Sequence, residues 1–237
     1  MKIEILECIE GAKKAEGLTV IIDVFRAFSL EAYLFSKGAL RIIPVGQLES
    51  AFALKKEHPD WPLFGERKGA QVEGCDFGNS PSQIKDLDFT GKTCIHTTSA
   101  GTQGIVNATK ADAIITGSLV NAAAIARYIE AKNPEQVSLV AMGNQGVSRA
   151  DEDVLCARYI KSLLEHSDFD LASGIEALKE TDGKKFLDPN NLIFPRDDFF
   201  FATQVNQFDF VIEVKDDGNQ KVFCLKGFFC IIEIWNT

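Results

Sequence analysis

The chain has 237 residues, of which 46% are hydrophobic and 25% are charged, as in an ordinary globular protein. Its formal net charge of -9 argues against a general affinity for nucleic acid or for an anionic membrane surface. No stretch offers the roughly 20 uncharged apolar residues that span a bilayer, so neither nucleic acid nor a membrane is an expected partner.

The cysteines and the N-terminus indicate a cytoplasmic protein. The six cysteines form no C-x-x-C pair and have no metal-ligand spacing with the three histidines, which favours reduced thiols. The N-terminal stretch MKIEILECIEGAKK carries acidic side chains inside its only apolar run, unlike a secretory signal peptide.

Strand and helix patterns alternate over residues 1–166. Leu18 to Ile22 is a continuous apolar, β-branched run, typical of a strand buried on both faces, and it ends at Asp23. The expected strands are residues 2–6, 18–22, 40–45, 62–64, 92–96, 113–116 and 137–142. The expected helices are residues 30–37, 48–56, 105–108 and 122–132, one from about residue 150, and one starting at Ser80-Pro81 with Gln83 placed for a capping box. This alternation predicts an α/β fold with a layered, mostly parallel sheet and helices on both faces.

Beyond His166 the pattern is less regular. Residues 171–180 and 197–204 favour helices, while 208–214 and 221–225 favour a hairpin around an Asp-Asp-Gly-Asn turn. The apolar tail, residues 227–237, is typical of a further strand. We expect a main α/β domain over residues 1–166 and a smaller C-terminal α+β extension over 167–237, packed on the main sheet with an antiparallel edge as one arrangement.

The stretch from Gly65 to Pro81, GERKGAQVEGCDFGNSP, combines four glycines with charged and amide side chains and has few apolar residues to bury. Glycine lets the backbone approach a ligand closely, so this stretch is a candidate binding loop. An ordinary polar surface loop is the alternative interpretation.

Polar clusters also follow other expected strands. Asp23 lies where open α/β sheets place their ligands, although it could simply cap the next helix. The hydroxyl-rich stretch Thr97 to Thr102 could cradle an anion or form a Ser/Thr-capped helix start, and Gly117 to Asn121 follows the next strand. The acidic triplet 151–153 suits either a helix dipole or a metal.

One shared site explains these clusters better than several unrelated loops, because the carboxyl ends of parallel strands open on one edge of a sheet. Carboxylates in this number favour a hard cation such as Mg2+, whereas arginines and glycine amides favour a phosphate or another oxyanion. The candidate groups are the carboxylates of Asp23, Glu66, Asp76, Glu152 and Asp153 and the guanidiniums of Arg26, Arg67 and Arg149. They suggest metal-assisted phosphoryl chemistry.

The chain resembles the 2-phosphosulfolactate phosphatase family. The resemblance rests on DVFRA from Asp23, GER from Gly65, CDFGNSP from Cys75, TTSAGT from Thr97, GSLVN from Gly117 and EDVLCA from Glu152, with FFFATQVNQFDFV from Phe199 as a weaker match. These motifs stand in the family's order over roughly residues 20–160. One departure is Ser99-Ala100, where the family pattern has Thr-Asn, so Ala100 lacks an amide that could contact substrate.

The resemblance implies a Mg2+-dependent phosphatase that converts 2-phospho-3-sulfolactate to sulfolactate and phosphate, on a route toward coenzyme M. We expect Asp23, Glu66 and one or both of Glu152 and Asp153 to hold Mg2+, with Arg26 and Arg67 neutralising charge at phosphorus. The catalytic group is then Asp23, Arg26, Glu66 and Arg67. The expected substrate-binding residues are Asp76, Asn79, Ser80, Thr97, Thr98, Gly101, Thr102, Ser118, Asn121 and Arg149. Whether water or Asp23 is the nucleophile is open.

Two other functions are alternatives for these residues. A non-catalytic α/β protein that binds an anionic metabolite would use the same arginines and glycine amides without turnover. A dinucleotide-dependent oxidoreductase is weaker, because no G-x-G-x-x-G follows the strand at Leu18 to Ile22. The expected partner is therefore a small phosphorylated anion, and the oligomeric state is open, with a homodimer as one alternative.

Overall fold

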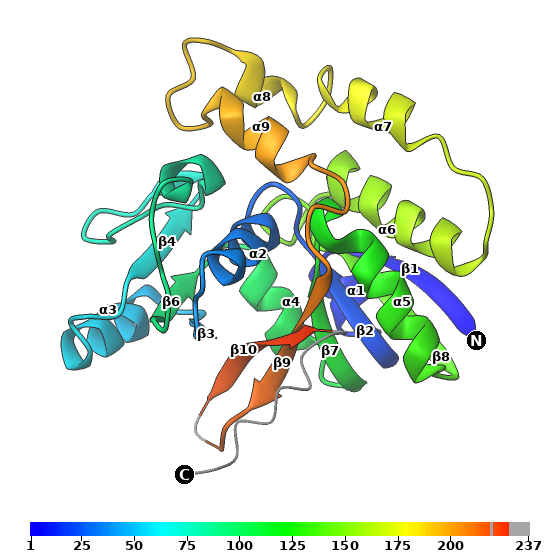
Figure 1. The fold of residues 1–237 in the computed structure, drawn as a ribbon, viewed down its shortest axis with the longest axis horizontal. Coiled ribbons are helices and arrows are strands. Elements are labelled where there is room, and N and C mark those ends of the chain that lie inside the picture. Colours follow the sequence, from blue (N-terminus) through cyan, green and yellow to red (C-terminus); the bar gives the residue numbers. More distant parts are fainter. Residues whose placement is uncertain (219, 228–237) are drawn as a thin grey trace.

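The structure is a computed structural model that describes residues 1–218 and 220–227. Over this part of the chain, strands form one mixed sheet with helices packed around it, which confirms the α/β fold class (Figure 1). The expected strand at residues 227–237 lies outside the described residues except for Gly227. No helix in residues 1–218 or 220–227 is long and apolar enough to cross a membrane.

Within the described residues, the expected strands and most expected helices are present. The strands are β1 (Lys2–Glu7), β2 (Gly17–Ile22), β3 (Arg41–Pro44), β4 (Leu63–Arg67), β5 (Ala70–Gln71), β6 (Thr93–Thr97), β7 (Ala111–Gly117), β8 (Gln136–Ala141), β9 (Phe210–Asp216) and β10 (Lys221–Gly227). The α-helices are α1 (Cys8–Ala12), α2 (Ala27–Ser36), α3 (Leu48–Glu57), α4 (Gly101–Asn107), α5 (Ala122–Lys132), α6 (Asp151–Leu164), α7 (Leu171–Leu178), α8 (Lys184–Leu187) and α9 (Arg196–Ala202). Short 3-10 helices are η1 (Pro81–Ile84) and η2 (Leu119–Asn121). The sequence pattern missed α1, β5 and α8, which are all short.

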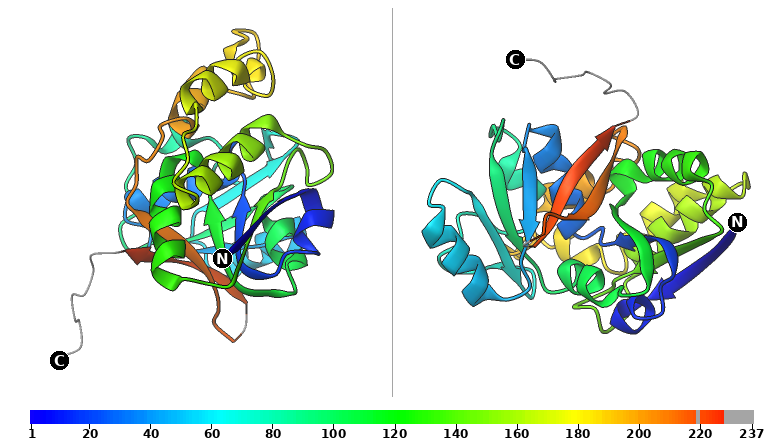
Figure 2. Two further views of the ribbon diagram at one scale, coloured as in Figure 1. Left: turned by 90° about the vertical axis from the view of Figure 1, so that its right-hand side faces the viewer. Right: turned by 90° about the horizontal axis from the view of Figure 1, so that it is seen from below.

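The C-terminal hairpin lies in the middle of the sheet, so the expected edge position is wrong. The strand order is β1-β8-β2-β7-β9-β10-β3-β6-β4-β5, with β9 beside β7 and β10 beside β3. Figure 2 shows the orange and red hairpin between the two other groups of strands. Adjacent residues Val211 and Ile212 are both fully buried and face different core clusters, as in a central strand.

The two parallel groups of strands run in opposite senses across this hairpin. Each of the three pairings from β7 through β9 and β10 to β3 is antiparallel, so a flat sheet would put the carboxyl ends of β2 and β6 at opposite edges. The prediction that the carboxyl ends of these strands all open on one edge of the sheet is therefore too simple. Successive strands twist by about 20–25°, which over the five steps from β2 to β6 turns the strands by about 100–125° and offsets much of the reversal.

Helices cover both faces of the β1-β8-β2-β7 group because the strand residues alternate between two cores. Val20 and Ile22 belong to the core formed with α5 and α6, whereas Ile21 belongs to the core formed with α2 and α4. Because β2 is buried on both faces, its end at Asp23 is held inside the protein rather than at a mobile surface.

The stretch from Gly65 to Pro81 is more ordered than a surface loop. β4 runs through Glu66 and Arg67 and pairs with the short strand β5, so these two residues are on a strand. The chain then returns so that the amide of Gly65 donates to the carbonyl of Phe77 at 3.0 Å. The expected helix at Ser80 is only the 3-10 turn η1, because the Ser80 hydroxyl bonds to Asp198 instead of capping.

The segment that carries α7, α8 and α9 lies over one end of the sheet, beside α6 and α2 (Figures 1 and 2). α7 contacts α6, while α9 contacts α2 and η1. This segment and the central hairpin both belong to residues 167–237, and the domain boundary at residue 166 stays a prediction. The cysteines at positions 8, 75, 94, 156 and 224 are unpaired.

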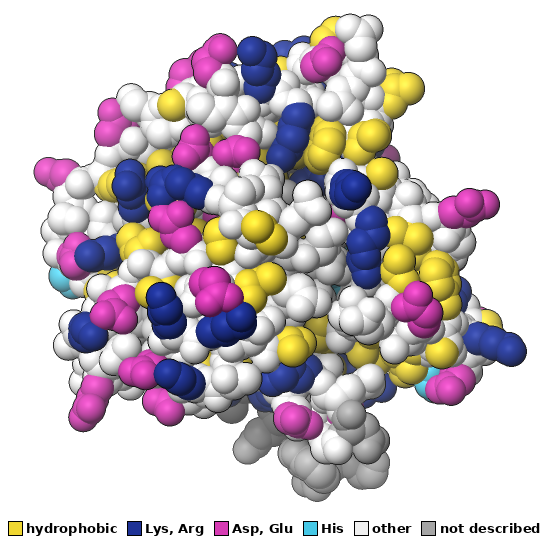
Figure 3. All heavy atoms as spheres, turned by 180° about the vertical axis from the view of Figure 1, so that it is seen from behind, with side chains coloured by type: hydrophobic (Ala, Val, Ile, Leu, Met, Phe, Trp, Pro, Cys, Tyr) yellow, Lys and Arg dark blue, Asp and Glu magenta, His cyan; other side chains and the backbone are white. Residues whose placement is uncertain are grey.

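Side chains of both charge signs are interspersed on the face shown in Figure 3. That face has no extended basic patch of the kind that binds nucleic acid, in keeping with the acidic composition.

Candidate active site

A cavity of about 300 Å³ lies where β2, β4, the loops after β6 and β8, and the start of α6 come together. Its volume is at the lower end of the range usual for small-molecule sites. The lining residues are Asp23, Phe25, Arg26, Glu66, Lys68, Gly69, Asn79, Ser99, Ala100, Gly143, Asn144, Gln145, Glu152, Asp153, Lys185 and Phe194. All four carboxylates expected to hold a metal are therefore in one cavity.

Asp23 is held by backbone groups at the end of β7 and at the start of α2. Its amide donates to the carbonyl of Gly117 at 3.2 Å, and its Oδ1 accepts from the amide of Ala27 at 3.2 Å. Gly101 allows α4 to begin against this carboxylate, because a Cβ there would lie 2.8 Å from the Phe28 ring and 3.3 Å from Asp23 Oδ2. Asp23 thus both caps α2 and faces the cavity, so the two alternatives for this residue hold together.

Asp153 joins two of the loops that form the cavity. Its Oδ1 accepts from the amide of Val24 at 2.7 Å, and its Oδ2 accepts from the amide of Gly143 at 2.8 Å. The acidic triplet divides between two roles, because Glu152 and Asp153 are buried in the cavity wall whereas Asp151 is partly exposed and pairs with Arg149. A dipole role alone does not explain two buried carboxylates.

The carboxylates repel one another at low dielectric. Burial and, to a smaller extent, the charge of Glu66 raise the pKa of Asp23 to about 6, against the lowering effect of the Ala27 amide. Burial and Asp153 raise the pKa of Glu152 well above its usual range, and burial and Asp23 do the same to the pKa of Asp153. A bound cation would relieve this repulsion.

The donor set suits a hard cation such as Mg2+, which prefers carboxylate oxygens. Glu152 Oε2 is a buried oxygen without a hydrogen-bond partner, as expected of an atom that takes a ligand. Within residues 1–218 and 220–227, no three His, Cys, Asp or Glu side chains lie close enough together to hold a metal ion. The carboxylates still match Mg2+ in donor chemistry, but in this arrangement at most two of them could ligate the ion directly, and water or substrate oxygens would complete its coordination.

The Asp23 carboxyl should make the free energy of unfolding depend on pH. Its pKa is raised from 3.8 to about 6 in the folded protein, so its contribution to stability falls as the pH rises through this window. We therefore expect Asp23→Asn to gain stability relative to the wild type between pH 4 and pH 7, by up to about 3 kcal/mol. Urea unfolding in EDTA at several pH values measures this difference, and a difference that does not change with pH would contradict the expectation.

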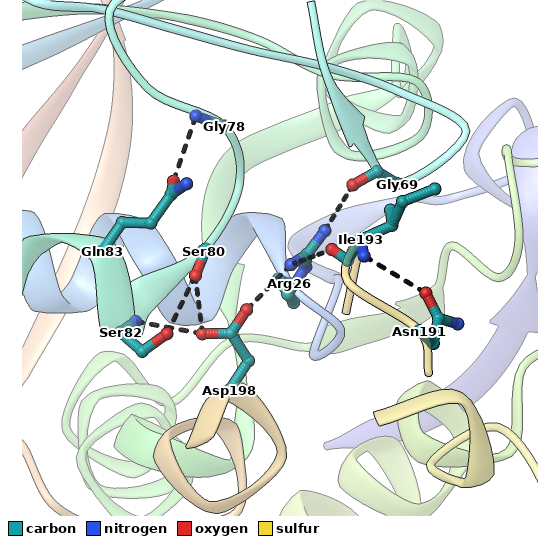
Figure 4. Close-up of polar contacts among 9 residues, drawn as sticks. All are labelled: Arg26, Gly69, Gly78, Ser80, Ser82, Gln83, Asn191, Ile193 and Asp198. Atoms are coloured by element: carbon teal, nitrogen blue, oxygen red, sulfur yellow. Dashed lines mark hydrogen bonds and ion pairs between the residues drawn. The ribbon is translucent and has the colours of Figure 1, made fainter. Parts of the chain in front are cut away.

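Arg26 lines the cavity, but its guanidinium is already bound by protein groups (Figure 4). Nη1 pairs with Asp198 Oδ2 at 2.8 Å and lies 3.4 Å from the carbonyl of Ile193, while Nη2 donates to the carbonyl of Gly69 at 2.6 Å. The ring of Phe194 lies 4.9 Å from the guanidinium carbon. This geometry supports a tether between the cavity and the segment of α8 and α9, and the predicted role at phosphorus stays a prediction.

Arg67 does not line the cavity. Successive residues of a strand point to opposite faces, so Glu66 faces the cavity and Arg67 faces away. Arg67 donates to the Thr97 hydroxyl at 2.9 Å and to the carbonyl of Glu66 at 2.6 Å. Its predicted catalytic role has no support from this arrangement.

Of the expected substrate-binding residues, Asn79 lines the cavity and the others make structural contacts. Thr98 Oγ1 accepts from the Thr102 amide at 3.2 Å at the start of α4. Ser118 and Asn121 form the capping box of η2. The residues outside the cavity lining are Asp76, Ser80, Thr97, Thr98, Gly101, Thr102, Ser118, Asn121 and Arg149. Asp76 pairs with Lys55 at 2.8 Å, and Arg149 pairs with Glu7 at 2.6 Å near the surface.

The sequence pattern missed the cations that face the carboxylates. Burial raises the pKa of Asp23, Glu152 and Asp153, and the charge of Lys185, on α8, offsets a small part of each rise. The Lys185 ammonium lies over aromatic rings, 5.2 Å from the centre of the Phe194 ring, and makes no ion pair with a described carboxylate; Lys68 also lines the cavity. Lys185 follows no strand and belongs to no motif, so only the tertiary structure identifies it.

A buried histidine behind the cavity was also missed. His96 Nδ1 lies 2.8 Å from Glu31 Oε1, and its Nε2 lies 2.6 Å from Asn79 Oδ1. His96 stands on β6 directly before the hydroxyl-rich stretch, but a single histidine in an apolar strand is no signal by itself.

A family model and three relatives with known names agree on which family this chain resembles. The family model for 2-phosphosulpholactate phosphatase matches residues 4–217. A Bacillus subtilis protein named probable 2-phosphosulfolactate phosphatase is 33% identical over 205 residues, covering 85% of this chain and 88% of the relative. A protein of the same name from Carboxydothermus hydrogenoformans is 39% identical over 165 residues, covering 69% of this chain and 68% of the relative. A third protein of this name, from Clostridium perfringens strain SM101, is 36% identical over 171 residues, covering 69% of this chain and 68% of the relative.

The family model spans the strands and loops that form the cavity, from β1 to the end of β9. The carboxylates in the cavity lie within motifs that carry the resemblance, namely those at Asp23, Glu66 and Glu152-Asp153. The chain therefore belongs to the 2-phosphosulfolactate phosphatase family.

Proposed function

We propose that this protein is a Mg2+-dependent phosphatase that hydrolyses the phosphate ester of 2-phospho-3-sulfolactate or a closely related 2-phospho acid. The observation that carries the proposal is one cavity in which four carboxylates face two lysines that are free of ion pairs within the described chain. Such a site suits a cation together with a multiply charged anion. The family membership supports the substrate class.

Mg2+ would be held by carboxylates from the set Asp23, Glu66, Glu152 and Asp153, at most two of them as direct ligands and the others through water. The ion would neutralise charge on the transferring phosphoryl group. Lys68 and Lys185, which line the same cavity, bind acidic groups of the substrate, and the Ser99 hydroxyl, 3.3 Å from Glu66 Oε1, orients that carboxylate. Arg26 holds the wall that carries Phe194 in place.

The departure at Ala100 lies inside the cavity, where a longer amide side chain would reach substrate. We propose that it changes which 2-phospho acid is preferred. Ala100→Asn restores the residue of the family pattern and should shift that preference toward 2-phospho-3-sulfolactate.

The experiment that tests the function is release of inorganic phosphate from a panel of 2-phospho acids, including 2-phospho-3-sulfolactate, with Mg2+ and with EDTA. Release that requires Mg2+ is the expected result. No release from any member, together with tight binding of one, would overturn the phosphatase proposal and favour a non-catalytic protein that binds an anionic metabolite.

Lys185 should contribute to substrate binding through its charge. We expect Lys185→Met to raise KM about 10- to 100-fold, because it removes a charge-assisted contact with an anionic group. Lys184→Met is a matched control, since Lys184 is the exposed neighbour and does not line the cavity. Steady-state kinetics checks both variants, and equal KM changes in the two would argue against a specific contact.

The unpaired cysteines of the described chain suit a reducing compartment, and we propose that the protein acts in the cytoplasm. A homodimer stays a prediction.

A further inference from the structure

Three buried polar side chains form a line from the core to the cavity. Glu31 on α2 contacts His96 on β6 at 2.8 Å, and His96 contacts Asn79 at 2.6 Å. Glu31 and His96 are fully buried, and Asn79, which is 4% exposed, lines the cavity. The chemistry proposed above uses neither Glu31 nor His96.

The direction of the hydrogen bonds in this line decides what Asn79 offers to a ligand. A neutral imidazole has one N–H donor and one acceptor nitrogen. If Glu31 is ionised, it accepts from Nδ1–H, and Nε2 must then accept from the Asn79 amide, which turns the Asn79 oxygen toward the cavity. If Glu31 is protonated, it donates to Nδ1, and Nε2–H donates to Asn79 Oδ1, which leaves the NH2 group for the cavity.

The surroundings favour a protonated Glu31. Its Oε2 is buried without a hydrogen-bond partner, and an ionised carboxylate with an unpaired oxygen in the core would be costly. The ring of Phe64 packs edge-on to His96 at 6.3 Å, and both Glu31 and His96 are 0% exposed, so water does not solvate the pair. Burial and the charge of Asp23 raise the pKa of Glu31, while burial and Arg67 lower the pKa of His96 to about 3.

The backbone on both sides of Asn79 is also fixed, as Figure 4 shows. The Gly78 amide donates to Gln83 Oε1 at 3.2 Å, and the Ser80 hydroxyl donates to Asp198 Oδ1 at 2.8 Å. The only hydrogen-bond partner of the Asn79 side chain among the described residues is His96, through the Asn79 oxygen, so the amide nitrogen is free to take a ligand.

We propose that Glu31 and His96 are positioning residues that hold the Asn79 carboxamide with its NH2 group toward the cavity, where it donates to an oxyanion of the substrate. This inference rests on the proposed function for the identity of that oxyanion. It assigns Asn79 to the anion and not to the cation, because the reverse direction would present an oxygen that suits Mg2+.

The tautomer of His96 tests the direction without any substrate. The chain has three histidines, so 15N-histidine NMR spectra, assigned with His58→Gln and His166→Gln, give a resolvable set. The expected result is a neutral ring with the proton on Nε2 at neutral pH. A proton on Nδ1, or a doubly protonated ring, would overturn the proposal whatever the enzyme hydrolyses.

Binding of inorganic phosphate tests the donor role, with calorimetry as the readout. Asn79→Ala should weaken phosphate about 10- to 100-fold, since a hydrogen bond to a charged group is lost. Glu31→Met should weaken it several-fold, whereas Glu31→Gln, whose amide can still donate to Nδ1, should restore affinity to within about twofold. Unchanged phosphate affinity in Asn79→Ala would overturn the donor role. Because binding needs no turnover, this outcome is distinct from a failure of the phosphatase proposal.

Discussion

Asp23→Asn should lower kcat for phosphate release by at least about 100-fold while the protein stays folded. Asp23 lines the cavity, accepts a hydrogen bond at the start of α2 and lies against α4, and it interacts electrostatically with Glu66, Asp153 and Lys185. The loss is expected whether Asp23 attacks phosphorus or holds Mg2+, because the amide is neither a nucleophile nor a comparable cation ligand. Steady-state phosphate release with saturating Mg2+ measures the effect.

Asp151→Asn is the matched control for this variant. Asp151 belongs to the acidic triplet of α6 but does not line the cavity, so its activity should stay close to that of the wild type. An Asp23→Asn enzyme that keeps most of its activity would remove Asp23 from the chemistry.

The two routes for Asp23 differ in where labelled oxygen goes. In a single turnover in H2(18)O, attack by water places the label in phosphate. An aspartyl-phosphate route places no label in phosphate when the ester bond to phosphorus first breaks. If water then attacks phosphorus, the label enters phosphate, as in direct attack, and if water attacks the carboxyl carbon, the label enters the Asp23 carboxylate and the phosphate stays unlabelled. Trapping of a phosphorylated Asp23 by rapid quench and mass spectrometry separates these cases, and its absence under conditions of fast turnover supports direct attack by water.

Asp198→Ala should lower the free energy of unfolding by about 3–5 kcal/mol, because it leaves the buried Arg26 guanidinium without its counter-charge. Both side chains are almost fully buried, at 0% and 3% exposed. The same carboxylate also accepts from the Ser80 hydroxyl at 2.8 Å and from the Ser82 amide at 3.0 Å, so the variant leaves these donors unpaired too (Figure 4). A loss of this size is a large part of the 5–15 kcal/mol that is usual for a protein.

Urea unfolding of two further variants makes this prediction specific. Asp197→Ala changes the exposed neighbour on α9 and should alter stability by less than about 0.5 kcal/mol. The double variant Arg26→Met with Asp198→Leu removes both charges together, so it should lose less than the sum of the two single changes. Additive losses would show that the pair contributes through separate contacts and not as a buried ion pair.

The local pattern of the sequence was enough to predict most strands, most helices and the four carboxylates of the cavity. A continuous apolar run such as that of β2 predicts a strand that is buried on both faces. This prediction does not require knowing which strands or helices pack against it. Asp23 and Asp153 were found because each stands at a boundary between elements, where short polar motifs occur.

A residue's role could not be predicted in this way when it depends on the side to which its side chain points. Glu66 and Arg67 are adjacent in the same motif, yet the alternation of a strand places one in the cavity and the other outside it. The hydroxyls of Thr98, Thr102 and Ser118 looked like ligand contacts but satisfy backbone groups at helix starts, a use that the sequence alone does not distinguish from anion binding.

The sequence by itself thus determined the fold class, the family motifs and the acidic character of the site, because these follow from side-chain chemistry and short-range periodicity. Only the tertiary structure placed the C-terminal hairpin in the middle of the sheet, brought Lys185 over the carboxylates and joined Glu31 to His96. These features rest on contacts between residues far apart in the chain, such as the 172 positions that separate Arg26 from Asp198. Which distant surfaces meet is decided by the packing of whole elements, which no local pattern encodes.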